Sequence, residues 1–309
     1  MINHYNDNFQ SIINEQCSPE NKLLYEITHI NDDLQIDSML LKIKNNKIVI
    51  FNYNNNGWQT RAFAYKKLIE LVLEKYQIKD CSLKISLGDY PKVGYFHFCK
   101  PKNTNKSFLL PNFKFIYDNI VDNKNIYYSK IEDLKSWDEV KNFIRNNDID
   151  FDKKRDSFYF AGGRMHKVDT QRNKYFKLMN KDDPLFQGNF SVNNTDKFIP
   201  FTKHFEYKFQ IYLDGETLSD RMRLLLLMNS IPFYCTSQYE ELYSKMLKHE
   251  INYIEFEDIN KLNDIYCKYK SNYQLFNNII ENNKNFINNI LTIENLIKYT
   301  ADLINNLNN

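Results

Sequence analysis

Alternating apolar and polar positions near the start of the chain predict a pair of strands. Residues 39–43 and 48–53 are rich in apolar and β-branched side chains, and they flank Asn45-Asn46, a pair that tolerates the left-handed backbone of a tight turn. We therefore expect a hairpin. Between residues 58 and 76, apolar side chains such as Ala64, Leu68 and Val72 recur at the spacing of one buried helix face, which predicts a helix.

A second alternating run, residues 81–87, ends abruptly at Gly88-Asp89-Tyr90-Pro91. It predicts a strand whose carboxyl end is followed by Asp89. Open α/β sheets bind ligands outside the carboxyl ends of their strands, so this position suits a functional carboxylate. An aspartate in a proline-containing turn is also a common structural feature, and the pattern alone leaves both interpretations open.

The second half of the chain alternates strand and helix patterns. Residues 157–160 predict a strand that runs into Gly162-Gly163-Arg164, and a helix is expected from about residue 174. Residues 207–213 and 231–235 predict two more strands, and the apolar spacing of residues 218–226 predicts a helix between them. This alternation favours a parallel, doubly wound lobe. Residues 262–307 are helical in pattern.

Length and composition favour two packed lobes. A chain of 309 residues exceeds the usual size of a single core, and 42% hydrophobic residues with only 7 glycines and 7 prolines leave little material for long linkers. The 41 lysines and arginines nearly balance the 39 acidic residues. A net charge of +2 therefore argues against general nucleic-acid binding, and any phosphate recognition must be local.

The same features predict a cytoplasmic protein. Five widely spaced cysteines form no Cys-x-x-Cys pair, so the sequence indicates neither a disulfide framework nor a zinc site. The first ten residues are polar, and no stretch approaches the roughly 18 apolar residues of a membrane span. We therefore expect no signal peptide, no membrane anchor and a reducing compartment.

Two arginine-bearing segments are candidates for phosphate binding. Ser219 and Arg221 fall in the first turns of the helix predicted after residue 215, where free N–H groups and the helix dipole favour an anion. The Gly162-Gly163-Arg164 turn lets a phosphate approach the backbone beside a guanidinium. Each also has a structural interpretation, as a solvated arginine with a capping serine or as a simple glycine turn.

The sequence lacks the residue patterns of several other common nucleotide-binding and metal-binding sites. The sequence contains neither the Gly-x-x-x-x-Gly-Lys-Ser/Thr pattern nor Gly-x-Gly-x-x-Gly, which argues against ATP hydrolysis and hydride transfer. Asp148 and Asp150 have the Asp-x-Asp spacing of metal-dependent sugar transferases, but they lie in a charged stretch that is typical of a surface loop. The six histidines are scattered, and the sequence therefore predicts no metal site.

Segments between about residues 80 and 305 resemble, in order, motifs of the protein O-glucosyltransferase (Rumi) and capsule-associated xylosyltransferase group, glycosyltransferase family 90, with its related bacterial lipopolysaccharide glycosyltransferases. Asp89-Tyr90-Pro91 looks like the family's Arg-Asp-Tyr-Pro segment, and residues 95–100 are similar to its Phe-Ser-Phe-Ser-Lys strand. Residues 160–164 resemble Phe-Arg-Gly-Ser-Arg, and residues 204–215 resemble a His-x-x-Tyr-Lys strand with its terminal glycine. The match continues through Ser219-x-Arg221, residues 239–243, which are similar to a Glu-Phe-Phe segment, and the terminal helices with Tyr299.

The resemblance implies an α/β fold of the GT-B type, with two Rossmann-like lobes. Residues 1–120 would form the acceptor-side lobe and residues 121–284 the donor-binding lobe, while helices at about 285–309 pack back on the first lobe. It also implies an inverting glycosyltransferase that needs no metal or cofactor. Its donor would be a UDP-sugar carrying glucose or xylose, and its acceptor a hydroxyl of a glycan or protein.

The resemblance assigns roles to individual residues. Asp89 becomes the general base that deprotonates the acceptor hydroxyl, while Arg164 and Arg221 stabilise the departing nucleoside diphosphate. The remaining donor-binding candidates are Gly162, Gly163, Tyr207, Gly215, Ser219 and Glu241.

The sequence departs from the family pattern at two motif positions. Gly88 replaces the arginine of Arg-Asp-Tyr-Pro, and Ala161 replaces that of Phe-Arg-Gly-Ser-Arg, for which Arg155 or Arg223 are candidate substitutes. The cysteines that form disulfides in secretory members, and the retention tail of those members, are also missing. Two alternatives remain: a non-catalytic sugar- or nucleotide-binding relative, and a nucleotide-sugar epimerase or reductase with a bound dinucleotide.

Overall fold

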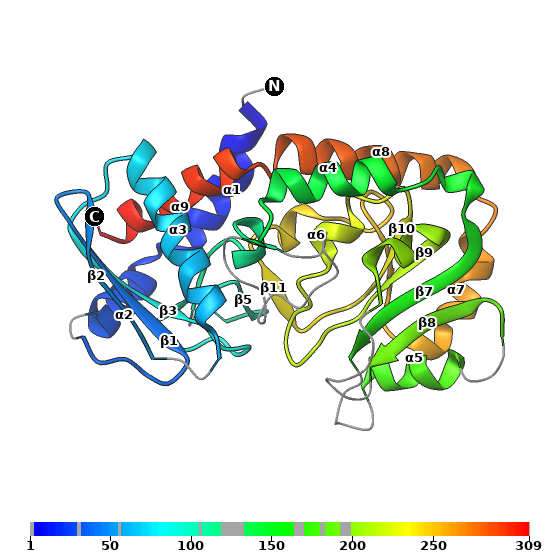
Figure 1. Ribbon diagram of the computed structural model, residues 1–309, viewed down its shortest axis with the longest axis horizontal. Coiled ribbons are helices and arrows are strands. Elements are labelled where there is room, and N and C mark those ends of the chain that lie inside the picture. Colours follow the sequence, from blue (N-terminus) through cyan, green and yellow to red (C-terminus); the bar gives the residue numbers. More distant parts are fainter. Residues whose placement is uncertain are drawn as a thin grey trace.

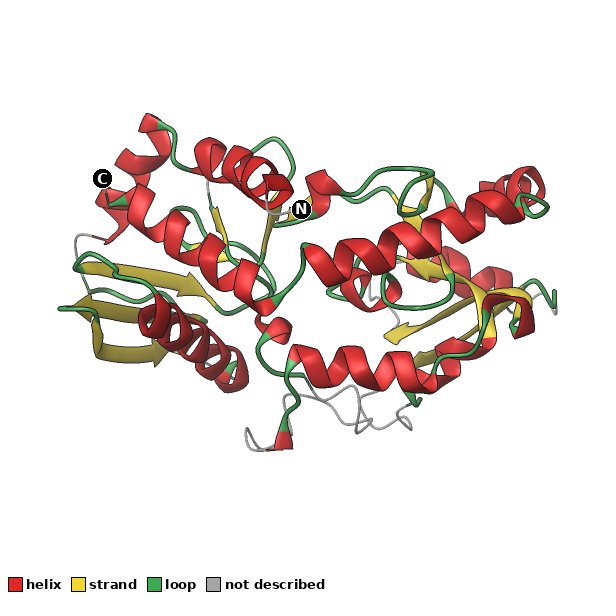
Figure 2. Ribbon diagram, turned by 90° about the horizontal axis from the view of Figure 1, so that it is seen from above, coloured by secondary structure: helices red, strands yellow, loops and turns green. Residues whose placement is uncertain are grey.

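The computed structural model describes residues 3–29, 32–54, 57–104, 107–118, 133–163, 170–179, 183–191 and 199–308. Two five-stranded sheets lie at opposite ends of an elongated molecule, with helices packed around each (Figure 1). Figure 2 shows from above that helices also fill the region between them. The chain is therefore mixed α/β, with parallel strand pairs in both sheets.

The first sheet has the strand order β2-β1-β3-β4-β6. β1 (Ser38–Lys44) and β2 (Lys47–Asn54) form the predicted hairpin, which turns at Asn45 and Asn46 with φ of 50° and 58°. β3 (Cys81–Ser86) confirms the second alternating run. β3 pairs antiparallel with β1 but parallel with β4 (Phe96–His97), and β4 pairs parallel with β6 (Phe108–Leu109). This sheet is therefore mixed.

Four helices cover the first sheet. α3 (Gln59–Lys75) is the predicted helix, and it buries Ala64, Leu68 and Val72 completely. α9 (Ile293–Leu307) packs against α3 and against α1 (Asn3–Gln16), while α2 (Pro19–His29) contacts β3. Tyr299 on α9 donates a hydrogen bond of 3.0 Å to the Leu109 carbonyl. The end of the chain thus returns to the sheet formed near its start.

The second sheet is parallel throughout, as its strand and helix alternation predicts. Its order is β12-β10-β9-β7-β8. The strands are β7 (Arg155–Gly163), β8 (Phe186–Ser191), β9 (Tyr207–Tyr212), β10 (Ile231–Cys235) and β12 (Ile254–Phe256). One face packs in a phenylalanine-rich core against α5 (Gln171–Met179), α7 (Leu262–Tyr269) and α8 (Tyr273–Asn289).

A separate hydrophobic core joins the first sheet to the face of the second sheet that lies opposite the phenylalanine-rich core. It contains the buried residues of α4 (Trp137–Asn147) and of α6 (Met222–Leu225) together with those of α3 and α9. β5 (Cys99–Pro101) pairs antiparallel with β11 (Tyr239–Glu241), so a two-stranded sheet also links the halves. Short 3-10 turns occupy Phe113–Phe115, Phe151–Lys153, Phe201–Glu206, Ser244–Met246 and Ile259–Lys261.

The helix predicted over residues 218–226 is wrong in extent. Only the four residues of α6 are α-helical, and Ser219 and Arg221 precede them. The reason is a contact within the same segment: the Tyr212 hydroxyl accepts from the Ser219 N–H and donates to the Ser219 carbonyl. Both backbone groups are thereby withdrawn from helical bonding. The argument for a phosphate site at a helix N-terminus therefore fails here.

Candidate active site

Asp89 lies just beyond the carboxyl end of β3, and its carboxylate is held by a residue from another element. The Arg61 guanidinium on α3 donates to Asp89 Oδ1 over 2.9 Å, and it also donates to the carbonyls of Leu87 and Gly88 over 2.7 and 2.9 Å. The Arg61 side chain is 5% exposed, whereas that of Asp89 is 41% exposed. A fixed, charge-assisted fork therefore orients a carboxylate that solvent or a ligand can still reach.

Aromatic rings and a histidine hold this arrangement in place. The Arg61 guanidinium lies 4.1 Å from the centroid of Trp58 and 4.8 Å from that of Phe113. His97 Nε2 lies 2.9 Å from the Gly88 carbonyl oxygen. Burial lowers the pKa of His97 to about 4, so the ring is neutral at physiological pH.

The Asp89 loop is bonded to the second sheet. Thr217, in the loop after β9, donates its hydroxyl to the Asp89 carbonyl over 2.8 Å, and Tyr90 donates to Glu216 Oε2 over 2.9 Å. Thr217 is buried, whereas Tyr90 is half exposed. The loop of residues 213–217 therefore lies between the two sheets and positions the Asp89 backbone.

Two arginines converge on one phenylalanine at the carboxyl end of β7. The guanidinium carbons of Arg221 and of Arg172, on α5, lie 4.8 and 5.4 Å from the Phe160 ring centroid. Arg172 donates to the carbonyls of Gly163 and Leu213 over 3.2 and 3.3 Å. The buried Nη1 of Arg221 has no hydrogen-bond partner in the described part of the chain. Two guanidinium groups, one of which has an unused N–H donor, suit the binding of a multivalent anion.

Burial and the neighbouring charges both change the pKa values of the groups in this arginine cluster. Burial lowers the pKa of Arg221, and burial together with the charge of Arg221 lowers the pKa of Arg172 to about 10. Burial acts in the opposite direction on Asp214, at the end of β9, and raises its pKa to about 6 although Ser237 donates to it over 2.6 Å. Both arginines still carry their charge at neutral pH.

Gly162 makes room for the cluster, whereas a side chain at Gly215 would make only an ordinary contact. A Cβ at Gly162 would lie 2.9 Å from the Phe160 ring and 3.3 Å from Arg221 Nη2, and a Cβ at Gly215 would lie 3.4 Å from Arg172 Nη2. A Cβ at Gly163 would meet nothing within 4 Å, so steric crowding is not the reason for a glycine at this position. Arg164, the other arginine expected here, lies outside the described residues.

The remaining predicted donor-binding residues lie at different places. Ser219 is buried beside Tyr212 and immediately precedes the segment that carries Arg221. Glu241, at the end of β11, lines a cavity together with Tyr212. Tyr207 starts β9 and stacks on Tyr159 at 4.5 Å. It therefore lies toward the amino end of the parallel sheet, away from Gly162.

Neither proposed substitute for the arginine missing at position 161 joins the cluster. Arg223 forms a buried ion pair with Asp118, and Arg155, at the start of β7, lies 3.6 Å from Glu206. Arg172 supplies the second guanidinium instead. Sequence reasoning missed Arg172, although an arginine in the first turn of a helix after a glycine-ended strand was an available signal.

The Asp-x-Asp pair has separate partners. Asp148 accepts from the buried Lys154 ammonium and from the Asn229 backbone N–H, and its side chain is only 2% exposed, so it does not lie on the surface as expected. Asp150 is exposed and pairs with Lys153. Among the described residues, no three histidine, cysteine or acidic side chains come together as metal ligands would. No helix in the described ranges is long and apolar enough to cross a membrane.

The chain matches a known protein family. The family model named Glycosyl transferase family 90 matches residues 13–309, which is nearly the whole chain. No curated protein gives a significant match.

Proposed function

The chain belongs to glycosyl transferase family 90, and on that basis we propose that it transfers glucose or xylose from a UDP-sugar to a hydroxyl of a glycan or protein. Family membership makes it a glycosyltransferase; the donor, the acceptor and the mechanism are our proposal. The observation that carries it is the placement of Asp89 and the arginine cluster at two ends of one loop, residues 213–217. Thr217 bonds to Asp89, and Leu213 bonds to Arg172.

The proposed reaction is a single displacement at the anomeric carbon. Asp89 accepts the proton of the acceptor hydroxyl, whose oxygen forms the new bond to that carbon as the bond to the diphosphate oxygen breaks. Breaking that bond adds one negative charge to a diphosphate that already carries two, and Arg221 and Arg172 stabilise this charge in a site prepared before the reaction. Attack opposite the leaving group inverts the anomeric configuration.

The proposal extends to fold type and metal use. A mixed first sheet, a parallel second sheet and a returning α9 are compatible with a GT-B arrangement of acceptor and donor lobes. Two guanidiniums can neutralise a diphosphate without a divalent cation. We therefore propose a metal-independent enzyme that works where UDP-sugars are made, in the cytoplasm.

The test is a screen of nucleotide sugars in EDTA, read by thermal shift and by slow donor hydrolysis, with wild type and Asp89→Asn. One UDP-sugar should stabilise both proteins, and only the wild type should hydrolyse it. Asp152→Asn, at an exposed position, serves as the control and should behave as wild type. If Asp89→Asn hydrolyses the donor as fast as the wild type does, Asp89 is not the base.

The screen also separates the alternatives. Binding without hydrolysis by any of the proteins would favour a non-catalytic binding relative, which the replacement of arginine by Ala161 makes worth testing. Absorbance from a retained dinucleotide would favour an epimerase or reductase. If no nucleotide sugar binds, the assignment of Arg221 to a diphosphate is wrong.

A further inference from the structure

Asp214 lies at the carboxyl end of the second sheet, in the loop that joins the Asp89 loop to the arginine cluster. It follows β9, the middle strand of the order β12-β10-β9-β7-β8, by two residues. The neighbouring strands β7 and β10 run parallel to β9, so their carboxyl ends lie on the same side. A charge at this position therefore acts on a ligand bound outside these strand ends.

Arg172 packs against the backbone on both sides of Asp214. Its Nη2 donates to the Leu213 carbonyl over 3.3 Å, and a Cβ at Gly215 would lie 3.4 Å from the same nitrogen. Arg172 shares the Phe160 ring with Arg221. Asp214 therefore places a carboxyl group beside the two arginines that we assign to the donor diphosphate.

The hydrogen bonding of the Asp214 carboxyl is incomplete. Ser237, two residues after the end of β10, donates its hydroxyl to Oδ2 over 2.6 Å. Oδ1 is shielded from solvent and has no hydrogen-bond partner in the part of the chain that the structure describes. A buried, unpaired oxygen makes the carboxylate costly, whereas the Ser237 hydroxyl and the charge of Arg172 favour it. The two protonation states are therefore close in free energy.

The pKa of Asp214 agrees with this balance. Burial raises the pKa to about 6, although the Ser237 hydrogen bond and the charge of Arg172 oppose the change. At pH 7 the carboxyl in the empty site is therefore mostly ionised, and it balances part of the positive charge of the arginines. A diphosphate on the same arginines brings further negative charge close to Asp214, which disfavours the carboxylate.

We propose that Asp214 is the counter-ion of the empty arginine cluster and that it takes up a proton from solvent when the donor diphosphate binds. The inference rests on the proposed function, because it requires the diphosphate on Arg221 and Arg172. The proton removes a negative charge that would repel the ligand. Donor affinity therefore depends on pH, and it weakens as the pH rises through the pKa of Asp214.

The titratable and charged groups that act on Asp214 in the described part of the chain come from several elements. They are Arg172 on α5, Tyr212 on β9, Tyr234 and Cys235 on β10, Tyr239 and Glu241 on β11, and Cys99 on β5. Burial raises the pKa of each tyrosine and cysteine and lowers that of Arg172 only to about 10, so these groups keep one state between pH 6 and pH 8. Of the groups named, Glu241 titrates in the same range, because burial raises its pKa to about 8.

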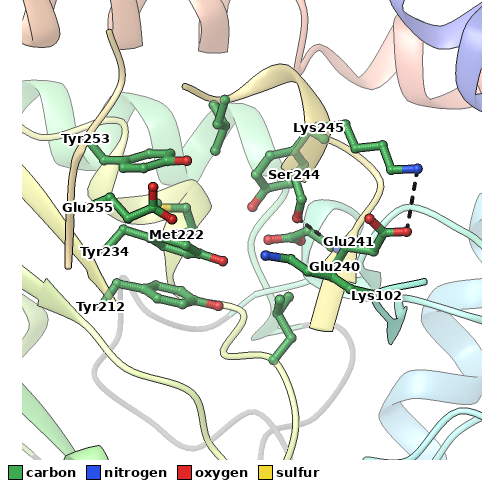
Figure 3. A pocket seen from close by; sticks show the side chains of 13 residues that line it. Lys102, Tyr212, Met222, Tyr234, Glu240, Glu241, Ser244, Lys245, Tyr253 and Glu255 are labelled. Atoms are coloured by element: carbon green, nitrogen blue, oxygen red, sulfur yellow. Dashed lines mark hydrogen bonds and ion pairs between the residues drawn. The ribbon is translucent and has the colours of Figure 1, made fainter. Parts of the chain in front are cut away.

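Glu241 has different surroundings from Asp214, which allows the two titrations to be separated. It lines a cavity of about 210 Å³, across from a tyrosine wall formed by Tyr212, Tyr234 and Tyr253 (Figure 3). The centroids of the first two rings are 5.0 Å apart and those of the last two 4.9 Å. Glu241→Gln therefore removes the second titrating group and keeps the Ser237 and Arg172 side chains beside Asp214.

The experiment is calorimetric titration with UDP-glucose and UDP-xylose, whose diphosphate has no group that titrates between pH 6 and pH 8. Titrations at pH 7 in PIPES and in imidazole, which differ in ionisation enthalpy, count the protons taken up per ligand bound. Wild type should take up roughly half a proton or more, and its affinity should fall roughly 5- to 25-fold from pH 6 to pH 8. Asp214→Asn should lose most of this uptake and change affinity by no more than about twofold.

Two further variants serve as controls. Asp152→Asn, at an exposed position, should behave as wild type. Glu241→Gln should keep the proton uptake, which is counted per ligand bound and does not depend on affinity. If wild type binds a UDP-sugar without taking up a proton, or if Asp214→Asn takes up as many protons as wild type, the inference is refuted while the proposed function stands. A wild type that binds neither UDP-sugar nor UDP refutes both.

Ser237→Ala tests the same point should Asp214→Asn fail to fold. Loss of the hydroxyl that donates to Oδ2 disfavours the carboxylate and raises the pKa of Asp214. The fall in donor affinity should therefore move to higher pH than in wild type. An unchanged pH profile in Ser237→Ala would show that Asp214 is not the group that takes up the proton.

Discussion

Arg61, on helix α3, holds Asp89 through a bond of 2.9 Å to the carboxylate and two further bonds to the carbonyls just before it. A lysine keeps the charge but cannot reach three acceptors in one plane. We expect Arg61→Lys to lower donor hydrolysis about 10- to 100-fold, equivalent to about 1.4–2.7 kcal/mol, because the base loses its orientation. UDP affinity should stay within about twofold of wild type.

Steady-state rates and calorimetric UDP titration check this expectation. Arg155→Lys is the matched control, because Arg155 is exposed and pairs with Glu206 at the surface. A variant that loses UDP affinity in parallel with rate would show that Arg61 supports donor binding as well and not Asp89 in particular.

The contact between Thr217 and Asp89 predicts a smaller effect on the same step. Thr217→Val removes a buried hydroxyl and leaves the Asp89 carbonyl without that donor, at a cost of about 0.5–1.5 kcal/mol. Hydrolysis should fall roughly 2- to 10-fold. Tyr90→Phe removes the neighbouring bond to Glu216 at an exposed site and should change the rate less. Equal effects of the two variants would contradict a special role for the Thr217 bond.

Local patterns predicted the elements of this fold well. The hairpin at Asn45-Asn46, α3 and the parallel strands β7, β9 and β10 all follow from short-range periodicity. The same periodicity placed Asp89 just after a strand, which the structure confirms, whereas its role stays a prediction. The helix predicted over residues 218–226 is shorter in the structure because a contact within the same segment, the Tyr212 hydroxyl on Ser219, outweighs local helical spacing.

The candidate site was predicted only in part, for a related reason. Arg61 and Arg172 are distant in sequence from Asp89 and Arg221, and nothing in a local pattern joins them. The tyrosine wall likewise consists of one residue from each of three successive strand segments, which become neighbours only through strand order. A site whose residues come from several elements can be predicted only when the order of those elements in the fold is known.

The arginine cluster predicts opposite effects on binding and on stability. Arg221 is a half-buried cation whose buried Nη1 lacks a partner in the described structure, and Arg172 adds a second positive charge nearby. Arg221→Met should weaken UDP binding by about 1.5–3 kcal/mol, because bonds to a charged group are lost. The unliganded protein should become no less stable, because an apolar side chain removes a burial cost.

Calorimetry with UDP and urea denaturation of the free protein measure the two quantities. Arg145→Met, at an exposed position of α4, controls for a general loss of positive charge. Unchanged UDP affinity would refute the diphosphate assignment, and strong destabilisation would show that Arg221 is a structural residue.

Glu241 predicts how stability depends on pH. Burial raises its pKa from 4.5 in the unfolded chain to about 8, so the folded protein retains a proton that the unfolded chain releases. The contribution is fully present below pH 4.5 and is lost as pH rises through 8. Glu241→Gln has no charge to bury and should lack this loss. The variant should therefore gain stability relative to wild type between pH 5 and pH 9, by on the order of a few kcal/mol.

Urea denaturation of both proteins at these two pH values gives the difference directly. The buried histidine His97 titrates in both proteins, so its contribution cancels in the comparison. Glu74→Gln, at an exposed position, should parallel wild type at both pH values. If Glu241→Gln also parallels wild type, the Glu241 carboxyl is ionised in the folded protein, and the cavity beside the tyrosines contains a negative charge at neutral pH.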